Sequence, residues 1–106
     1  GVQVISVNTY YADNGQVNML KGDGETDASI GNHAGIRDTS ELLAIDPDGI
    51  RSDKLAADRD GVSGDPRRSS AEWGERLLTL KVEAALAEIR AAQSGLQLSP
   101  NHKSGD

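Results

Sequence analysis

Residues 2–7 form the one stretch of this chain that is typical of a β-strand, and a single strand cannot make a sheet. The apolar residues of this segment are β-branched and fall on both of its faces: Val2, Val4, Ile5 and Val7. This pattern predicts a strand that is buried on both sides. The sequence offers no second stretch of this kind as a partner. We therefore expect the strand to lie in a sheet that another polypeptide completes.

Two helices are expected farther along the chain. The first covers residues 36–45 and ends at Asp46, because a residue that precedes proline avoids the α-helical region. The second begins with a capping box, Ser69-Ser70-Ala71-Glu72, and ends near Gly95. Its apolar residues recur at alternating spacings of four and three, as in the buried stripe of an amphipathic helix: Leu78, Val82, Ala85, Ile89 and Ala92.

Two long stretches, residues 12–34 and 46–69, are rich in glycine and polar residues and read as loops. Compact domains rarely contain loops of more than about 15 residues without structure of their own. We therefore expect residues 1–95 to be one part of a larger domain, and residues 96–106 to be a disordered tail. Because the sequence begins with Gly1 and not Met, we expect a processed product, an engineered piece or part of a longer chain.

The composition argues against several classes of partner. The formal net charge is −6, which disfavours binding to the phosphates of nucleic acids and to an anionic membrane surface. No apolar run is long enough to span a bilayer. The absence of cysteine excludes disulfides and thiolate metal sites, and it fits a cytoplasmic protein.

His33 is the histidine in the setting that best suits chemistry. It lies in the run GNHAG at the predicted start of a helix, where small neighbours let its backbone approach another group closely. An imidazole, whose pKa is ordinarily about 6.5, can act as a general acid or base near neutral pH, and Asp38 could orient it. The alternative is that His33 merely caps or fills the junction of loop and helix. His102, in the tail, is expected to be solvated.

The sequence itself contains no pattern of metal ligands. It has two histidines and lacks the HxH, HxxxH and HExxH spacings of zinc sites. The acidic run of residues 22–27 lacks the spacing of a calcium loop and reads as a solvated loop. Tyr10 and Tyr11 end the predicted strand, and in an α/β sheet the strand ends face the ligand crevice. At least one of the two tyrosines is expected to belong to the core.

Three motifs, taken together, resemble the creatininase family. The family signature His-Ala-Gly-Glu-x-Glu-Thr-Ser is followed by a helix that runs into a proline turn, and then by Gly-Val-x-Gly-Asp-Pro and the last helix. The matching stretches follow in the same order, at residues 33–40 (HAGIRDTS), 42–47 (LLAIDP) with 50–51 (IR), 61–66 (GVSGDP) and 70–76 (SAEWGER). The resemblance extends from the predicted strand to about Ala92.

The resemblance implies an α/β fold. The chain would be the C-terminal part of a three-layer α/β/α domain with a largely parallel sheet, completed by another polypeptide segment. It also implies a metal-dependent amidohydrolase that cleaves a C–N bond of an open-chain or cyclic amide, with metal-bound hydroxide as the nucleophile. The family's metal ligands lie in N-terminal and middle segments that have no counterpart here. Zinc or manganese would therefore be bound by a second chain or segment, within a homo- or hetero-oligomer similar to the family's hexamers.

The resemblance also assigns site residues, position by position. His33 matches the family's histidine that passes a proton to the leaving nitrogen, which is a poor leaving group until it is protonated. Asp38 matches the acid of the signature, shortened from Glu, and Tyr11 falls near an aromatic that closes over the substrate. Asn32 stands where creatininase has a carboxylate, and Ile36 replaces the common Glu. These differences favour a substrate other than creatinine, such as another amide or a lactone.

A second hypothesis assigns no chemistry to the chain. It would be a non-catalytic structural or assembly subunit, or a fragment, whose strand and helix stabilise a partner. His33 would then be a junction residue, and Asn32 would mark a lapsed site. The two hypotheses differ in what replacement of His33 does to amide hydrolysis.

Overall fold

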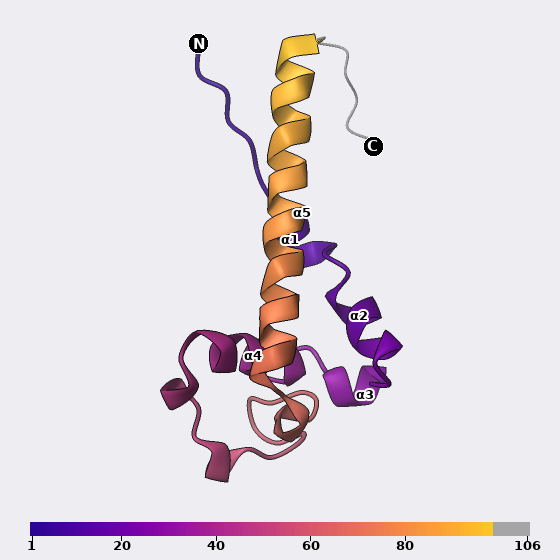
Figure 1. Cartoon of the computed structure of the whole chain (residues 1–106), viewed down its shortest axis with the longest axis vertical. Coiled ribbons are helices and arrows are strands. Elements are labelled where there is room, and N and C mark those ends of the chain that lie inside the picture. Colours follow the sequence, from indigo (N-terminus) through magenta and orange to yellow (C-terminus); the bar gives the residue numbers. More distant parts are fainter. Residues whose placement is uncertain (99–106) are drawn as a thin grey trace. The chain divides into compact units, whose positions relative to one another are not determined.

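The computed structural model describes the backbone of residues 1–98 and the side chains of residues 1–95. The elements of this range are helical (Figure 1), and no β-strand occurs in it. The α-helices are α1 (Thr9–Ala12), α2 (Gln16–Gly22), α3 (Asp27–Ile30), α4 (Ile36–Ile45) and α5 (Ala71–Leu98). Three short 3₁₀-helices join α4 to α5: η1 (Pro47–Gly49), η2 (Ser52–Lys54) and η3 (Pro66–Arg68). None of the helices is long and apolar enough to cross a bilayer, within the residues described.

The predicted α/β fold with a largely parallel sheet is therefore wrong for this chain. Residues 2–7, the predicted strand, belong to no regular element. Val2 and Val4 are about nine-tenths exposed, at 90% and 91%. A strand needs a neighbour that pairs with its backbone N–H and C=O groups, and residues 1–98 contain no such neighbour. A β-branched composition alone could not make the segment a strand.

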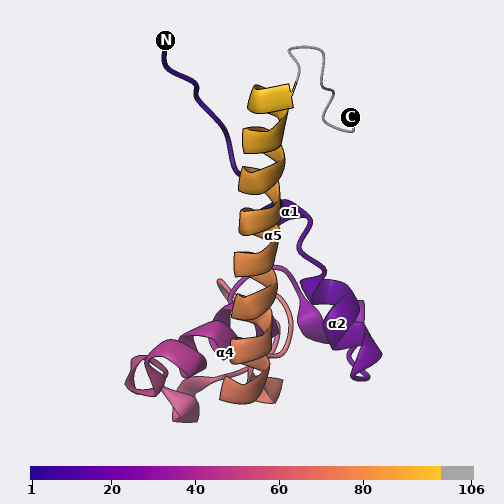
Figure 2. The same ribbon diagram turned by 45° about the horizontal axis from the view of Figure 1, so that its top comes forward.

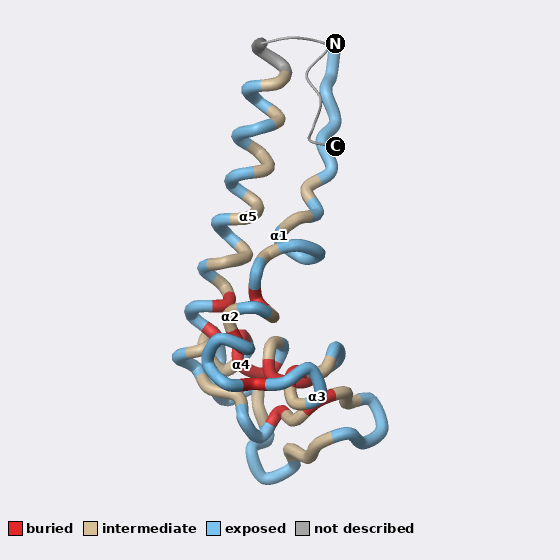
Figure 3. Tube along the Cα trace, turned by 90° about the vertical axis from the view of Figure 1, so that its right-hand side faces the viewer, coloured by how far each residue is buried: buried red, intermediate tan, exposed pale blue. Residues whose placement is uncertain are grey.

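The chain divides into two compact units. Unit 1 consists of residues 1–14 together with the chain from Lys81 onward, and unit 2 consists of residues 15–80. Helix α5 begins in unit 2 and continues into unit 1. Every buried hydrophobic residue described lies in unit 2: Leu20, Ile30, Ile36 and Leu77. Figure 3 shows the same division, since no residue of the described part of unit 1 is coloured as buried.

The core of unit 2 joins four helices. Leu20 comes from α2, Ile30 from α3, Ile36 from α4 and Leu77 from α5, and Val17, Met19 and Trp73 pack against them in part. In Figure 2, α2 and α4 lie on different sides of the first turns of α5. The core is small, with four buried hydrophobic side chains among the residues described, so polar contacts contribute much of the organisation of this unit.

A close backbone approach fixes the crossing of α4 and α5. A Cβ atom at Gly74 would collide with the carbonyl oxygen of Ser40, so these helices touch where α5 has no side chain. The Ser40 hydroxyl oxygen accepts a hydrogen bond from the Ser70 N–H at 3.1 Å. Glycine is thus required at residue 74 for packing, although it lowers the intrinsic stability of the helix.

The predicted helix over residues 36–45 is confirmed with the same bounds. The start of the second helix differs by one residue from the prediction. The Ser70 hydroxyl, and not that of Ser69, accepts the Trp73 N–H at 3.0 Å, while the Ser69 hydroxyl donates to the Ile36 carbonyl oxygen at 3.4 Å. The helix also continues beyond Gly95 to Leu98.

The predicted apolar stripe of the last helix does not form a core. Val82 is 57% exposed, whereas Leu77, which lies outside the stripe, is fully buried. The stripe followed the spacing of an ideal amphipathic helix, but the packing of unit 2 uses the neighbouring face. Residues 99–106 of the predicted tail, including His102, lie outside the described residues.

The stretch predicted as a loop over residues 12–34 contains two helices. One of them, α3, begins with a reciprocal cap: the Thr26 hydroxyl accepts the Ser29 N–H at 3.1 Å, and the Ser29 hydroxyl accepts the Thr26 N–H at 3.0 Å. Both helices contribute to the core through Leu20 and Ile30. The glycines that suggested a loop mark the boundaries of these helices.

Within unit 1, one carboxylate holds the N-terminal segment. Glu88 Oε1 accepts hydrogen bonds from the N–H groups of Asn8 and Thr9, both at 2.9 Å, and from the Thr9 hydroxyl at 2.8 Å. These donors lower the pKa of Glu88, with the backbone N–H of Thr9 the largest cause. A single acidic side chain thus anchors the first turn of α1 to α5.

Candidate functional site

The segment between α3 and α4, which contains His33, is paired with a loop about 30 residues away in the sequence. The Ser63 N–H donates to the His33 carbonyl oxygen at 2.8 Å, and the two residues form an isolated antiparallel bridge. The Asn32 N–H donates to the Ser63 hydroxyl at 3.3 Å. The backbone of the His33 segment is therefore fixed from outside, as the small residues around it suggested.

The imidazole of His33 is held by the same loop. Its Nδ1 lies 2.8 Å from the Gly61 carbonyl oxygen. A carbonyl oxygen can only accept a hydrogen bond, so Nδ1 must carry the proton and donate it. In the neutral ring, the lone pair is then on Nε2. His33 is exposed, and its second nitrogen can meet a ligand from outside unit 2.

The backbone on either side of His33 adopts unusual conformations. Gly31 has φ +63°, and a Cβ atom there would collide with the Ser63 carbonyl oxygen. Ala34 has φ +52°, a left-handed conformation that costs an ordinary L-residue about 1–2 kcal/mol. Strain of this kind persists only where the surroundings impose it, and it is common at functional sites.

Asp38 has a different partner from the one predicted. Its Oδ2 accepts the N–H of Ala34 at 2.9 Å from the first turn of α4. The carboxylate therefore stabilises the strained backbone next to His33. Its contact is with this backbone, so any effect on the imidazole is indirect. A second contact to Ala34 comes from Thr39, whose hydroxyl donates to the Ala34 carbonyl oxygen at 3.4 Å.

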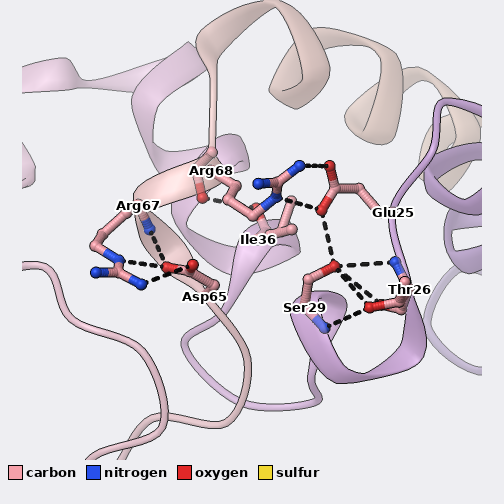
Figure 4. Close-up of polar contacts among 8 residues, drawn as sticks. Glu25, Thr26, Ser29, Ile36, Asp65, Arg67 and Arg68 are labelled. Carbon is pink, nitrogen blue, oxygen red and sulfur yellow. Dashed lines mark hydrogen bonds and ion pairs between the residues drawn. The ribbon is translucent and has the colours of Figure 1, made fainter.

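A polar network lies at the base of the paired loop (Figure 4). Arg68 makes a bidentate ion pair with Glu25, with N–O distances of 2.7 and 2.8 Å. The Ser29 hydroxyl donates to Glu25 Oε1 at 2.8 Å. Asp65 adds a backbone link, since its N–H donates to the Ser29 carbonyl oxygen at 2.8 Å. The network ties α3 to the end of the loop that carries Gly61 and Ser63.

The pKa values of both carboxyl groups in this network, those of Glu25 and Asp65, are lowered. The Arg68 guanidinium lowers the pKa of Glu25, and the Ser29 hydroxyl lowers it further against the opposing effect of burial. Arg67 lowers the pKa of Asp65 in the same way. The Glu25 side chain is 3% exposed, so its charge is satisfied by these partners and not by water.

The structure brings together three of the four residues predicted for the site. His33, Asn32 and Asp38 lie in one segment of unit 2. Asn32 is held by the Ser63 hydroxyl, and the ring of His33 is held by the Gly61 carbonyl oxygen. Tyr11 belongs to unit 1, where it is 76% exposed, and its ring lies edge-on to that of Tyr10 at 6.5 Å. The expectation that one of these tyrosines is a core residue is wrong.

Sequence reasoning missed the partner of the imidazole. The Gly61 carbonyl oxygen is backbone, so no residue type could reveal it. The signals that were available are the turn pairs Asp60-Gly61 and Gly64-Asp65, which mark a tight loop but do not show what it contacts. The pairing spans 28 residues and depends on the tertiary fold.

The resemblance places the metal ligands in a second chain or segment, and the residues described here show no cluster of such ligands. These residues contain no group of three or more His, Asp or Glu side chains placed to hold a cation. A groove of about 430 Å³ in unit 2 is lined by Met19, Glu75, Arg76, Thr79 and Leu80, none of which comes from the His33 segment. His33 is thus presented on a surface and not enclosed by this groove.

Comparison with known proteins gives no relative. No family model matches the chain, and neither a curated protein nor a solved structure does. The likeness to the creatininase family therefore rests on the sequence motifs alone.

Proposed function

We propose that this chain supplies a proton-transfer histidine, His33, to an amide-hydrolysing site that a second polypeptide segment completes. One observation carries the proposal: the ring is held through Nδ1 by the Gly61 carbonyl oxygen at 2.8 Å while the residue stays exposed. A histidine that only fills a junction has no need of a fixed ring and an accessible second nitrogen. The motifs at residues 33–40 and 61–66, which meet at this contact, support the same reading.

The role of His33 follows from its two ring nitrogens. The neutral ring takes up a proton at Nε2, and the protonated ring returns it from Nε2 to the nitrogen that leaves. An amide nitrogen departs only after it is protonated, so this transfer lowers a barrier that water alone lowers poorly. The Gly61 carbonyl oxygen accepts from Nδ1 in both states, which keeps the ring in one orientation during the transfer.

The proposal gives the second polypeptide the remaining parts of the site. Any divalent cation, zinc or manganese, is assigned to that segment, as the resemblance to the creatininase family implies. The substrate is a small open-chain or cyclic amide, and Asn32 and Asp38 are proposed to lie in or beside its pocket. The assembly is proposed to be a homo- or hetero-oligomer of the hexameric kind. We propose a cytoplasmic location, since a sequence without cysteine is compatible with that compartment.

The test compares two histidine variants in the purified assembly. Formation of carboxylate from creatinine, simple lactams and cyclic imides is followed with zinc or manganese added. We expect His33→Ala to lower turnover by about 100-fold or more, the usual contribution of a general acid or base, and His102→Ala to leave it unchanged. Equal turnover by His33→Ala and the unsubstituted assembly would overturn the catalytic role.

The exposed apolar side chains of unit 1 favour a second candidate, a non-catalytic assembly role. Several of them are large and at least two-fifths exposed: Val2, Val4, Ile5, Tyr10, Tyr11, Val82 and Leu86. Apolar surface on this scale, without a buried core in the same unit, is typical of a surface that another polypeptide covers.

Val82→Asp tests this second candidate. We expect it to prevent association with the partner, because a charge placed in an apolar interface lacks a counter-charge and costs several kcal/mol. Association is measured by size-exclusion chromatography with light scattering. Gln93→Asp, at an exposed position of the same helix, is the matched control and should associate normally. If Val82→Asp associates as well as the control, this face of α5 is not covered. If the assembly forms but hydrolyses none of the amides, the assembly role stands alone.

A further inference from the structure

The loop that carries Gly61 is closed at its base by one residue. The Asp58 N–H donates to the Gly64 carbonyl oxygen at 3.0 Å, and Asp58 Oδ1 accepts the Gly64 N–H at 3.0 Å. A third hydrogen bond, from the Val62 N–H to the Arg59 carbonyl oxygen at 2.7 Å, tightens the turn inside it. The loop is therefore closed into a ring from residue 58 to residue 64 by hydrogen bonds between its two ends.

The closed ring is attached to the rest of unit 2 at one end. The Ser63 N–H holds the His33 carbonyl oxygen, and the Asp65 N–H holds the Ser29 carbonyl oxygen, both at 2.8 Å. Gly61 precedes both of these anchoring residues in the sequence, and neither of the two hydrogen bonds involves it. Its carbonyl oxygen reaches His33 Nδ1 only if the loop keeps its shape, and that shape depends on the two hydrogen bonds of Asp58.

Asp58 suits this position for two separate reasons. Its φ is +47°, a left-handed conformation that aspartate and asparagine adopt more readily than most residues. Its carboxylate supplies the acceptor for the Gly64 N–H. Asparagine would satisfy both requirements, glycine only the first, and alanine neither.

We propose that Asp58 is a positioning residue, which closes the 58–64 loop so that the Gly61 carbonyl oxygen selects the Nδ1–H tautomer of His33. This inference rests on the proposed function, since it explains why Nε2 is the nitrogen that transfers the proton. A histidine side chain in water favours the Nε2–H tautomer, which would place a hydrogen where the proposed reaction needs a lone pair. The loop reverses that preference through one hydrogen bond.

Long-range ¹⁵N–¹H NMR of the full chain measures the tautomer without any assay of activity. The spectra are recorded at alkaline pH, where an ordinary imidazole is neutral, in a His102→Gln background so that His33 gives the imidazole signals. We expect the Nδ1–H form to predominate in this protein and in Asp58→Asn. Asp58→Gly should lose the preference and shift toward Nε2–H. Asp60→Gly, the same substitution at an exposed position inside the loop, is the matched control and should leave the tautomer unchanged.

Two results would overturn the inference. One is a predominant Nε2–H form in the chain that retains Asp58, which stays decisive even if Asp58→Gly fails to fold. The other is a retained Nδ1–H form in a folded Asp58→Gly, with folding checked by the dispersion of its amide signals. The proposed function fails separately, when the tautomer is as expected but His33→Ala keeps its turnover.

Discussion

Glu25 shows how much of unit 2 depends on individual polar residues. Its side chain is 3% exposed and carries the bidentate pair with Arg68. Removing one member of a buried charged pair leaves the other without its partner, and this costs more than the pair contributes. Because half of the Arg68 side chain is exposed, at 53%, water can take up part of the loss.

We predict that Glu25→Gln lowers the free energy of unfolding by about 1–3 kcal/mol at neutral pH. The folded state lowers the pKa of Glu25, so its carboxylate stabilises the fold fully above the ordinary glutamate pKa of about 4.3. That contribution is lost as the pH falls below this value and through the depressed pKa. The difference between the variant and the unsubstituted chain should therefore shrink on acidification.

Urea unfolding at a series of pH values measures this difference. Glu83→Gln, at an exposed position of α5, is the control and should change the stability by less than about 0.5 kcal/mol. A Glu25→Gln deficit that is absent at neutral pH, or that grows as the pH falls, would show that the Arg68 pair does not stabilise the fold.

At the scale of single residues, the sequence predicted a close backbone approach at His33 but not how the imidazole is held. The small residues around His33 indicated a close backbone approach, and the pairing with Ser63 bears this out. The role of Asp38 could not be predicted, because the left-handed conformation of Ala34 that it supports follows from tertiary contacts. A backbone partner such as the Gly61 carbonyl oxygen cannot be predicted from residue types, because every residue has a carbonyl group.

At the scale of the elements, the crossing of α4 and α5 depends on Gly74. We predict that Gly74→Ala lowers the free energy of unfolding by about 1–3 kcal/mol, as overpacking commonly does, because the new methyl group collides with the Ser40 carbonyl oxygen. Alanine has the higher helix propensity, so a loss of stability can come only from the contact between the helices.

Gly22→Ala is the matched control for this prediction. Gly22 lies at the end of α2, and a Cβ atom there meets nothing within 4 Å. The control should be neutral or slightly stabilising, and both variants can be compared by thermal unfolding. If Gly74→Ala is as stable as Gly22→Ala, the helices do not cross as closely as described.

The helices differ in how well the sequence predicts them. Helix α4 was predicted with its bounds, because Pro47 fixes its end and its apolar residues are periodic. Helices α2 and α3 were missed, since each is shorter than two full turns and has glycine at one or both ends. Such short helices are stabilised by tertiary packing and not by helix propensity. The local sequence does not show which segments will pack together.

At the scale of the whole molecule, the fold class was the largest error. The resemblance suggested a parallel sheet, and residues 2–7 have a strand-like composition, but the described chain is helical. A strand is a property of a pair of segments, so its formation cannot be deduced from one segment. The expectation that the chain needs a partner stays a prediction, and it is consistent with the exposed apolar residues of unit 1.

Native mass spectrometry of the purified protein, with metal analysis of the same sample, tests the central claim most directly. The claim is that this chain presents His33 to a site that a second polypeptide completes. We predict an assembly heavier than the 11.2 kDa chain that contains a longer polypeptide and bound divalent metal. A lone 11.2 kDa species without metal would contradict the claim, since His33 would then have no reaction to serve.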